Sequence, residues 1–206
     1  MKMKKKSAIL SVVILLAATS AAFADDGGAW LTLQANKRWQ KAYAFLRLEH
    51  RSNNRFGNTE AIFTSIGGGY SFTRWLNADL SYEYWHINPE VKFHKAVLSG
   101  TGTLTRDCLS VSIKEKLEFA VNPVNSATSL TMRSRLRAQY NFPGSIFKPY
   151  AMAEIFSWSS WIRSLYYAGT ELALGIHHRI DLYYLYHLPN GSQPVHILGA
   201  GYYFSF

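Results

Sequence analysis

Hydrophobic and polar residues alternate along most of this chain, and the alternation predicts β-strands. In residues 109–119, Leu, Val, Ile and Phe occupy the odd positions except for Glu115, and Ser, Lys and Glu occupy the even positions. A period of two places side chains of one type on one face of a strand. Similar patterns predict ten clear strands and a shorter candidate at residues 29–36. The clear strands lie near 42–51, 60–72, 75–86, 96–104, 108–119, 129–142, 148–158, 163–176, 178–188 and 194–206.

The last predicted strand is apolar and aromatic on one face and small or partly polar on the other. Tyr202, Phe204 and Phe206 share the apolar face, and Phe206 ends the chain. This ending resembles the terminal signature of bacterial outer-membrane β-barrels, which the barrel assembly machinery reads. The resemblance implies that the three aromatic residues form an assembly signal and that the assembly machinery is a partner.

The first 24 residues have the features of a secretory signal peptide. Residues 1–6 are basic, residues 8–18 are apolar, and Ala22-Phe23-Ala24 fits the small-x-small cleavage pattern. The apolar run is shorter than the roughly 20 residues that a membrane-spanning helix needs. We therefore expect export, cleavage after Ala24, and a mature chain of residues 25–206 that forms one domain.

Alternation alone fits two fold classes, because a soluble sandwich buries its apolar face whereas a membrane barrel turns that face to lipid. The signal peptide, the terminal Phe206 and the long strands favour the barrel. Aromatic residues make up 15% of the chain, and those near strand ends predict interfacial girdles. The girdle candidates are Tyr70, Phe72, Trp75, Tyr84, Trp85, Tyr140, Phe142, Trp158, Trp161, Tyr202 and Phe204.

The sequence thus predicts an all-β protein, a single antiparallel up-and-down transmembrane β-barrel of 10 to 12 strands. It would lie in the outer membrane, in contact with outer-membrane lipids and lipopolysaccharide. We expect the tight turns and the C-terminus to lie at the periplasmic end of the barrel and the longer loops to lie at the extracellular end. Because antiparallel closure needs an even number of strands, the role of residues 29–36 stays open. Gly67-Gly68-Gly69 predicts a strand kink that admits bulky neighbours inside the wall.

Charge and cysteine content exclude some function classes. The formal net charge is +9, and removal of four signal-peptide lysines leaves 18 Lys and Arg against 13 Asp and Glu, or +5. This modest excess does not indicate nucleic-acid binding. Cys108 stands alone, so it cannot form an internal disulfide. The scattered histidines predict no metal site, no cofactor is indicated, and the oligomeric state stays open.

The charged faces of the predicted strands would line the lumen. Buried charges need partners, so we expect a charged and largely ion-paired interior, with either a structural role or a narrow pore. The predicted lumen network consists of Arg47, Glu49, Arg51, Asp79, Glu83, Lys114, Lys116, Glu118, Arg133, Arg135, Arg137, Glu154, Arg163, Glu171, Arg179 and Asp181.

Two alternatives remain beside this prediction of a non-enzymatic barrel. His50-Arg51-Ser52-Asn53 resembles the His-x-Ser-Asn pattern of outer-membrane phospholipase A and lipid A 3-O-deacylase. At positions i and i+2 of a strand, His50 would deprotonate Ser52 for attack on an acyl ester, and Glu60 would orient His50. The second alternative is a surface-loop binding protein, which the short loops disfavour.

The order of short motifs along the mature chain resembles domain of unknown function 2490, an uncharacterised family of bacterial outer-membrane β-barrels. The resemblance implies a barrel fold and assigns no activity. The motifs are Trp30; Leu48-Glu49-His50-Arg51; Gly69-Tyr70-Ser71-Phe72 before Trp75-Leu76; Arg133, Arg135 and Arg137; Pro149-Tyr150 with Glu154-Ile155-Phe156; Arg163 before Gly169; Asp181-Leu182-Tyr183-Tyr184-Leu185; and His196-Ile197-Leu198.

Overall fold

The described part of the chain consists almost entirely of β-strands. The structure, a computed structural model, describes residues 27–53, 58–87, 91–158 and 160–206, so the predicted signal peptide lies outside the described residues. Within these ranges no helix is long and apolar enough to cross a membrane. The strands are β1 (Gly28–Trp39), β2 (Ala42–Asn53), β3 (Asn58–Ser71), β4 (Leu76–Ile87), β5 (Val91–Arg106), β6 (Leu109–Val121), β7 (Thr128–Tyr140), β8 (Phe147–Trp158), β9 (Ser160–Ala173), β10 (His178–Pro189) and β11 (Val195–Ser205).

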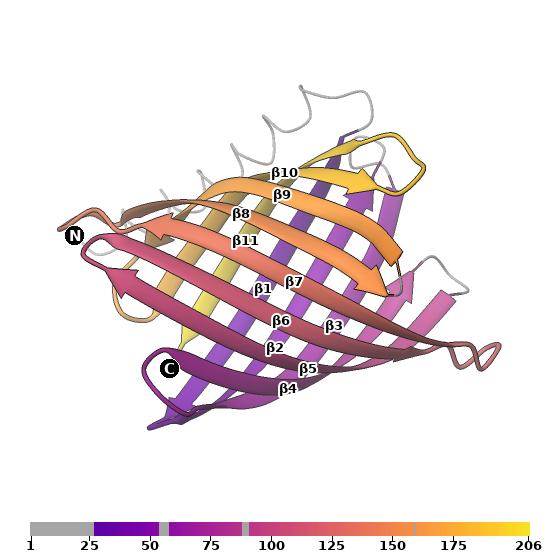
Figure 1. The fold of residues 1–206 in the computed structure, drawn as a ribbon, viewed down its shortest axis with the longest axis horizontal. Helices are drawn as coiled ribbons and strands as arrows, with labels where there is room; N and C mark the ends of the chain where they lie inside the picture. Colours follow the sequence, from indigo (N-terminus) through magenta and orange to yellow (C-terminus); the bar gives the residue numbers. More distant parts are fainter. Residues whose placement is uncertain (1–26, 54–57, 88–90, 159) are drawn as a thin grey trace, which may run out of the picture.

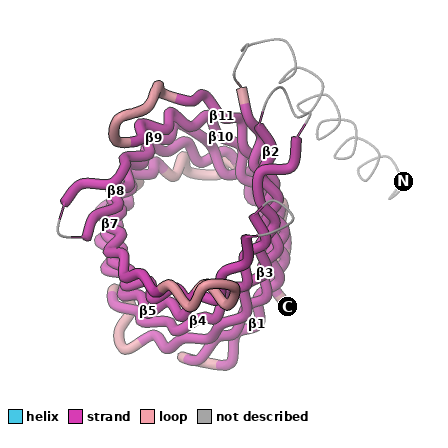
Figure 2. The backbone as a smooth tube through the Cα atoms, turned by 90° about the vertical axis from the view of Figure 1, so that its right-hand side faces the viewer, coloured by secondary structure: helices cyan, strands magenta, loops and turns pink. Residues whose placement is uncertain are grey.

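These strands form one closed barrel in which neighbours along the chain pair as antiparallel hairpins (Figure 1). Seen along the barrel, the backbone makes a complete ring (Figure 2). The prediction of an all-β barrel of 10 to 12 strands is therefore confirmed, with eleven strands in the described chain.

The barrel closes through a parallel pair. Strands β1 and β11 run in the same direction, with Gly28 opposite Ile197 and Asn36 opposite Ser205. The short candidate at residues 29–36 is thus a full strand, and the expectation of antiparallel closure by an even number of strands is wrong. With an odd number of strands, the start of β1 lies at one end of the barrel and the end of β11 at the other. We call these the Gly28 end and the Phe206 end.

Short connections occur at both ends. Residues 40–41, 107–108 and 174–177 connect strands at the Phe206 end, and residues 122–127 and 190–194 do so at the Gly28 end. Several predicted long loops are shorter because strands continue into them: β5 starts at Val91 and β9 starts at Ser160. Connection length therefore does not distinguish the two ends of this barrel.

The polarity of the wall is inverted relative to that of a water-soluble protein. Leu80 and Ile66 point outwards and are 60% and 61% exposed, whereas the carboxylate of Glu154 lies inside and is 0% exposed. This follows from the sequence, because apolar and charged residues alternate along each strand. The outer surface is mostly aliphatic and aromatic, and most of the charged side chains of the strands lie inside.

The glycines of β3 make room for large side chains inside the barrel. A Cβ on Gly67 would lie 2.5 Å from Phe45, and one on Gly69 would lie 2.5 Å from the ring of Tyr43. Such distances are far below van der Waals contact, so only glycine fits at these positions. The prediction that this triplet admits bulky neighbours is confirmed.

Candidate functional site: the charged lumen

Three arginines of β7 converge on the centre of the lumen. They alternate with outward residues such as Leu136, which is 51% exposed. The Nε of Arg133 donates to Glu154 Oε1 at 2.5 Å, and its Nη2 donates to Oε2 at 2.9 Å. The Nε of Arg135 donates to the same Oε1 at 3.0 Å. One fully buried carboxylate thus holds two guanidinium groups, the first of them by two parallel hydrogen bonds.

The ion pairs continue from this centre around the wall. Arg133 also bonds to Glu118 through Nη1 at 3.2 Å, and Lys95 Nζ lies 3.5 Å from Glu118 Oε2. These pairs join side chains on the same strand, on neighbouring strands or on strands two apart, so they form a layer of neutralised charge along the inner face of the wall. The other pairs are Arg47–Glu83 at 2.6 Å, Arg51–Glu49 at 2.8 Å, Lys114–Asp79 at 3.0 Å, Arg137–Glu171 at 3.0 Å and Arg179–Glu171 at 3.3 Å.

Every predicted member of the lumen network points into the barrel, and most members are ion-paired. Asp181 instead accepts a hydrogen bond from the hydroxyl of Tyr150 at 2.9 Å. Lys116 and Arg163 form no ion pair with a residue of the described ranges. Lys116 is nevertheless only 8% exposed, so the interior holds at least one buried cation without a close counter-charge.

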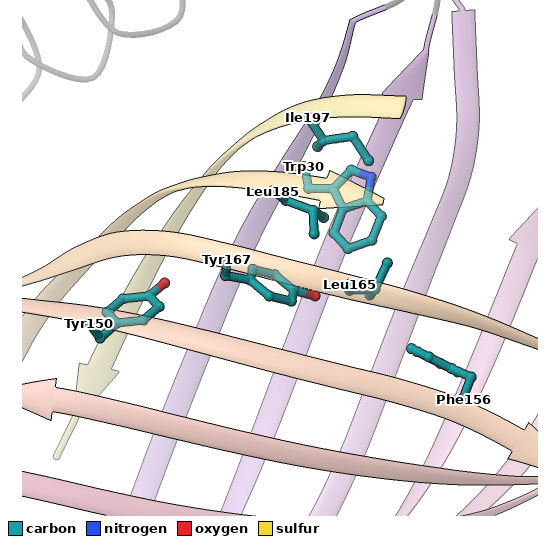
Figure 3. Packing of buried hydrophobic residues seen from close by; sticks show 7 residues of the cluster. All are labelled: Trp30, Tyr150, Phe156, Leu165, Tyr167, Leu185 and Ile197. Atoms are coloured by element: carbon teal, nitrogen blue, oxygen red, sulfur yellow. The ribbon is translucent and has the colours of Figure 1, made fainter. Parts of the chain in front are cut away.

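Aromatic rings line the lumen between the charges, which the sequence analysis missed. The guanidinium carbon of Arg51 lies 3.7 Å from the Trp30 ring centroid, and that of Arg137 lies 3.8 Å from the Tyr150 centroid. Cations over aromatic faces gain energy when both are shielded from water. Seven buried hydrophobic residues form one packed cluster (Figure 3): Trp30, Tyr150, Phe156, Leu165, Tyr167, Leu185 and Ile197.

Trp85 was predicted to belong to an outer girdle, and this is wrong. Its ring is 7% exposed, stacks on Phe63 at a centroid distance of 4.3 Å and donates through Nε1 to Glu83 at 2.9 Å. It shares inward parity with Glu83, two residues earlier on β4, and this parity could have placed it correctly. Lys95 was missed for a different reason, because its strand was expected to begin only at residue 96.

Free space inside the barrel is largest at the ends and smallest in the middle. A cavity of about 600 Å³ opens at the Phe206 end, and one of about 290 Å³ lies at the Gly28 end. Between them, a cavity of about 120 Å³ is lined by Arg133, Arg135, Glu83 and other members of the network. Side chains therefore narrow the lumen at mid-height, between a larger cavity at each end.

The three residues of the predicted acyl-hydrolase motif have different surroundings in the structure. The His50 ring lies against Thr59, with Nε2 at 3.2 Å from the Thr59 hydroxyl. The Ser52 hydroxyl is buried and donates to the backbone oxygen of Ala29 at 3.4 Å. Glu60 lines the cavity at the Gly28 end. A bulge between Arg51 and Ser52 shifts the register of β2 against β3, which places Thr59 rather than Glu60 beside His50.

The fold and its interior define the class of this protein: a small closed β-barrel with an apolar exterior and an ion-paired lumen. Residues 27–196 match the family model described as protein of unknown function (DUF2490), and the chain belongs to this family. The resemblance drawn from the sequence motifs is thereby confirmed at the level of the family. No curated protein matches the chain. In the described ranges, no group of three or more His, Cys, Asp or Glu could hold a metal ion.

Proposed function

We propose that the chain is an integral outer-membrane β-barrel whose lumen is closed at mid-height by ion-paired side chains. The observation that carries the proposal is the inverted polarity of the wall. An aliphatic band that encircles a barrel is stable against hydrocarbon, whereas in water so large an apolar surface favours association. Outer-membrane lipids and lipopolysaccharide would cover this band.

The two ends of the chain support the route to that membrane. Residues 1–24 would direct export, and Tyr202, Phe204 and Phe206 would be read by the barrel assembly machinery. The three aromatic residues alternate with inward residues on β11, and Phe206 is 56% exposed. An aromatic ridge on the outer face at the end of the last strand is accessible to an assembly partner.

The lumen supports a structural role over that of an open diffusion pore. Arg133, Arg135 and Glu154 occupy the middle of the barrel, and removing one partner from such a centre would leave a buried charge. The network therefore fixes its own geometry and leaves about 120 Å³ of free space at mid-height. Passage of a solute would require these pairs to separate.

Fractionation tests the location. The wild-type mature chain is expected in the outer-membrane fraction, and its electrophoretic mobility should change on heating, as for folded barrels. Recovery as a soluble periplasmic protein would refute the location. The measurement does not depend on whether the barrel conducts.

Planar-bilayer recording of the purified, refolded barrel tests the closed lumen. We expect no steady open-pore conductance from the wild type. Replacing both Arg133 and Glu154 with alanine should introduce conductance, because it removes two large side chains from the middle of the lumen without changing the net charge. Arg106→Ala, at the end of β5, is the control and should behave as wild type. A large, steady conductance of the wild type would refute the closed lumen.

A further inference from the structure

The cavity at the Gly28 end has the features of a binding site, beyond the closed-barrel role proposed above. Its floor is formed by Arg133 and Glu118, and its sides include Trp30, Arg51 and Arg163. The ion-paired network narrows the lumen below this cavity to about 120 Å³ of free space, so a molecule that enters from the Gly28 end meets a constriction. This arrangement suits reversible binding rather than passage.

Three residues that line this cavity each have a buried nitrogen atom without a hydrogen-bond partner in the described ranges: Trp30 Nε1, Arg163 Nε and His187 Nε2. Trp30 is only 6% exposed. Indole and guanidinium nitrogens donate and cannot accept, so the missing partner of at least two of these groups is an acceptor. Buried donors left unpaired cost free energy, and a bound acceptor would recover it.

The charges around the cavity favour an anion. Arg51, Lys95, Arg133 and Arg163 line it together with two carboxylates, Glu60 and Glu118. Arg163 has no ion-pair partner within the described ranges, and its guanidinium carbon lies over the Phe156 ring at 4.2 Å. A negatively charged group beside Arg163 would therefore gain a charge-assisted hydrogen bond without displacing an existing salt bridge.

Apolar side chains also line the cavity. Leu165, Val195 and Ile197 line it, and Leu165 and Ile197 are 2% and 4% exposed. Figure 3 shows the Trp30 ring beside Leu165 and Ile197 inside the barrel. A ligand in the cavity therefore meets both cations and hydrocarbon.

We propose that this cavity binds a small carboxylate that carries an apolar substituent. The carboxylate would accept hydrogen bonds from Arg163 and Trp30, and the substituent would pack on Leu165, Val195 and Ile197. A volume of about 290 Å³ limits the ligand to a small molecule, because ligand pockets commonly measure about 300–1,000 Å³. The ligand binds without a covalent step.

Titration calorimetry of the refolded barrel in detergent micelles tests this site, with 3-phenylpropionate as the probe. We expect saturable binding at one site per chain. The neutral 3-phenylpropionamide should bind at least tenfold more weakly, because it lacks the charge. Acetate should also bind at least tenfold more weakly, because it lacks the apolar group. Absence of saturable binding, or equal binding of either control compound, would overturn the proposal.

Two variants assign the binding to this cavity. Arg163→Gln should weaken binding of 3-phenylpropionate at least tenfold, and Trp30→Phe should weaken it several-fold because it removes Nε1–H but retains a ring. Arg179→Gln is the matched control, since Arg179 also lies over an aromatic ring, that of Tyr203 at 4.2 Å, but at the Phe206 end. The affinity of the Arg179→Gln variant for 3-phenylpropionate should equal that of wild type.

Heat-modified mobility verifies that each variant is folded. If Arg163→Gln fails to fold, Arg163→Lys takes its place, and a loss of affinity is still expected because lysine cannot reproduce the guanidinium donors. Unchanged affinity in the folded Arg163 and Trp30 variants would overturn the proposal. Because binding is measured in micelles, its failure is distinguishable from failure of the membrane location.

Discussion

Arg133 on β7 reaches diagonally to Glu154 on the neighbouring strand β8, and two hydrogen bonds join them, at 2.5 Å and 2.9 Å. Their side chains are 12% and 0% exposed, so this pair lies at the centre of the lumen. Arg135 and Tyr167 also bond to the same carboxylate. The position of several large side chains therefore depends on one acid.

Replacing this acid should destabilise the barrel. Glu154→Gln leaves Arg135 without its counter-charge and leaves Arg133 with Glu118 alone, and breaking a buried pair in this way costs about 3–5 kcal/mol. Urea unfolding in detergent, followed by tryptophan fluorescence, measures the change in the free energy of unfolding. Asp107→Asn, in the connection after β5, is the control and should have almost no effect. A loss below about 1 kcal/mol for Glu154→Gln would contradict the central role of this carboxylate.

The packing of Tyr183 requires glycine at position 199. A Cβ at Gly199 would overlap the Tyr183 ring, whereas a Cβ at Gly100 would meet nothing within 4 Å. Gly199→Ala should therefore lower the free energy of unfolding by about 1–3 kcal/mol through overpacking. Gly100→Ala should leave it unchanged or raise it slightly. Equal unfolding midpoints for the two variants would show that Tyr183 moves aside freely.

Glu115 is the exception on the apolar face of β6, and the structure places it outside. It is exposed and accepts a hydrogen bond from the Ser134 hydroxyl at 2.6 Å. If the outer band faces lipid, Glu115→Leu should raise the free energy of unfolding from lipid vesicles by about 1 kcal/mol, since acids on that face are unfavourable. Glu118→Leu, at an interior position, should be strongly destabilising. A destabilised Glu115→Leu barrel would indicate that its carboxylate has a partner outside this chain.

Deletion of Phe206 should impair assembly in cells. The Phe206 amide donates to Asn36 O at 3.1 Å, and its ring stacks on Phe204 with centroids 5.6 Å apart. These contacts are few, so we expect a modest change in stability but a clear loss of heat-modifiable protein from the outer-membrane fraction. Phe72→Ala, another exposed aromatic at the Phe206 end, is the control. Normal assembly after the deletion would refute the assembly-signal prediction.

The acyl-hydrolase alternative has a direct test. We expect no release of fatty acid from detergent-dispersed phospholipid or lipid A, and no effect of Ser52→Ala or His50→Ala on the fold. The reason is the local geometry: the Ser52 hydroxyl is directed to Ala29 O, and His50 lies against Thr59. Robust hydrolysis by wild type that Ser52→Ala abolishes would establish the enzyme instead.

Much of the fold could be predicted because alternation is a local property of the sequence. It located the strands and assigned Arg133, Arg135 and Arg137 to the interior, where the first two meet Glu154 and the third meets Glu171. Which residues pair across the lumen depends on register and closure, and these are set by the whole barrel. The parallel contact between β1 and β11 joins residues from the two ends of the chain, and no local pattern encodes it.

The errors in the predictions from sequence have local causes as well. Val91-Lys92-Phe93-His94-Lys95 lacks a clean alternation, so the start of β5 and the inward direction of Lys95 were missed. Trp85 was assigned to the outer girdle because it is aromatic and lies near a strand end. Its position two residues after Glu83 instead directs its side chain into the barrel. Glu60 was expected beside His50, but the register shift after Arg51 places Thr59 there instead. Bulges of this kind have no strong sequence signal.

The parallel seam has a practical consequence for labelling this protein. With β1 and β11 side by side and in the same direction, Gly28 and Phe206 lie at opposite ends of the barrel. In a membrane, an epitope joined ahead of Gly28 would be displayed on the surface opposite to the one that holds the C-terminus. An antibody applied to intact cells would then report the orientation of the barrel, while the last strand keeps its natural ending.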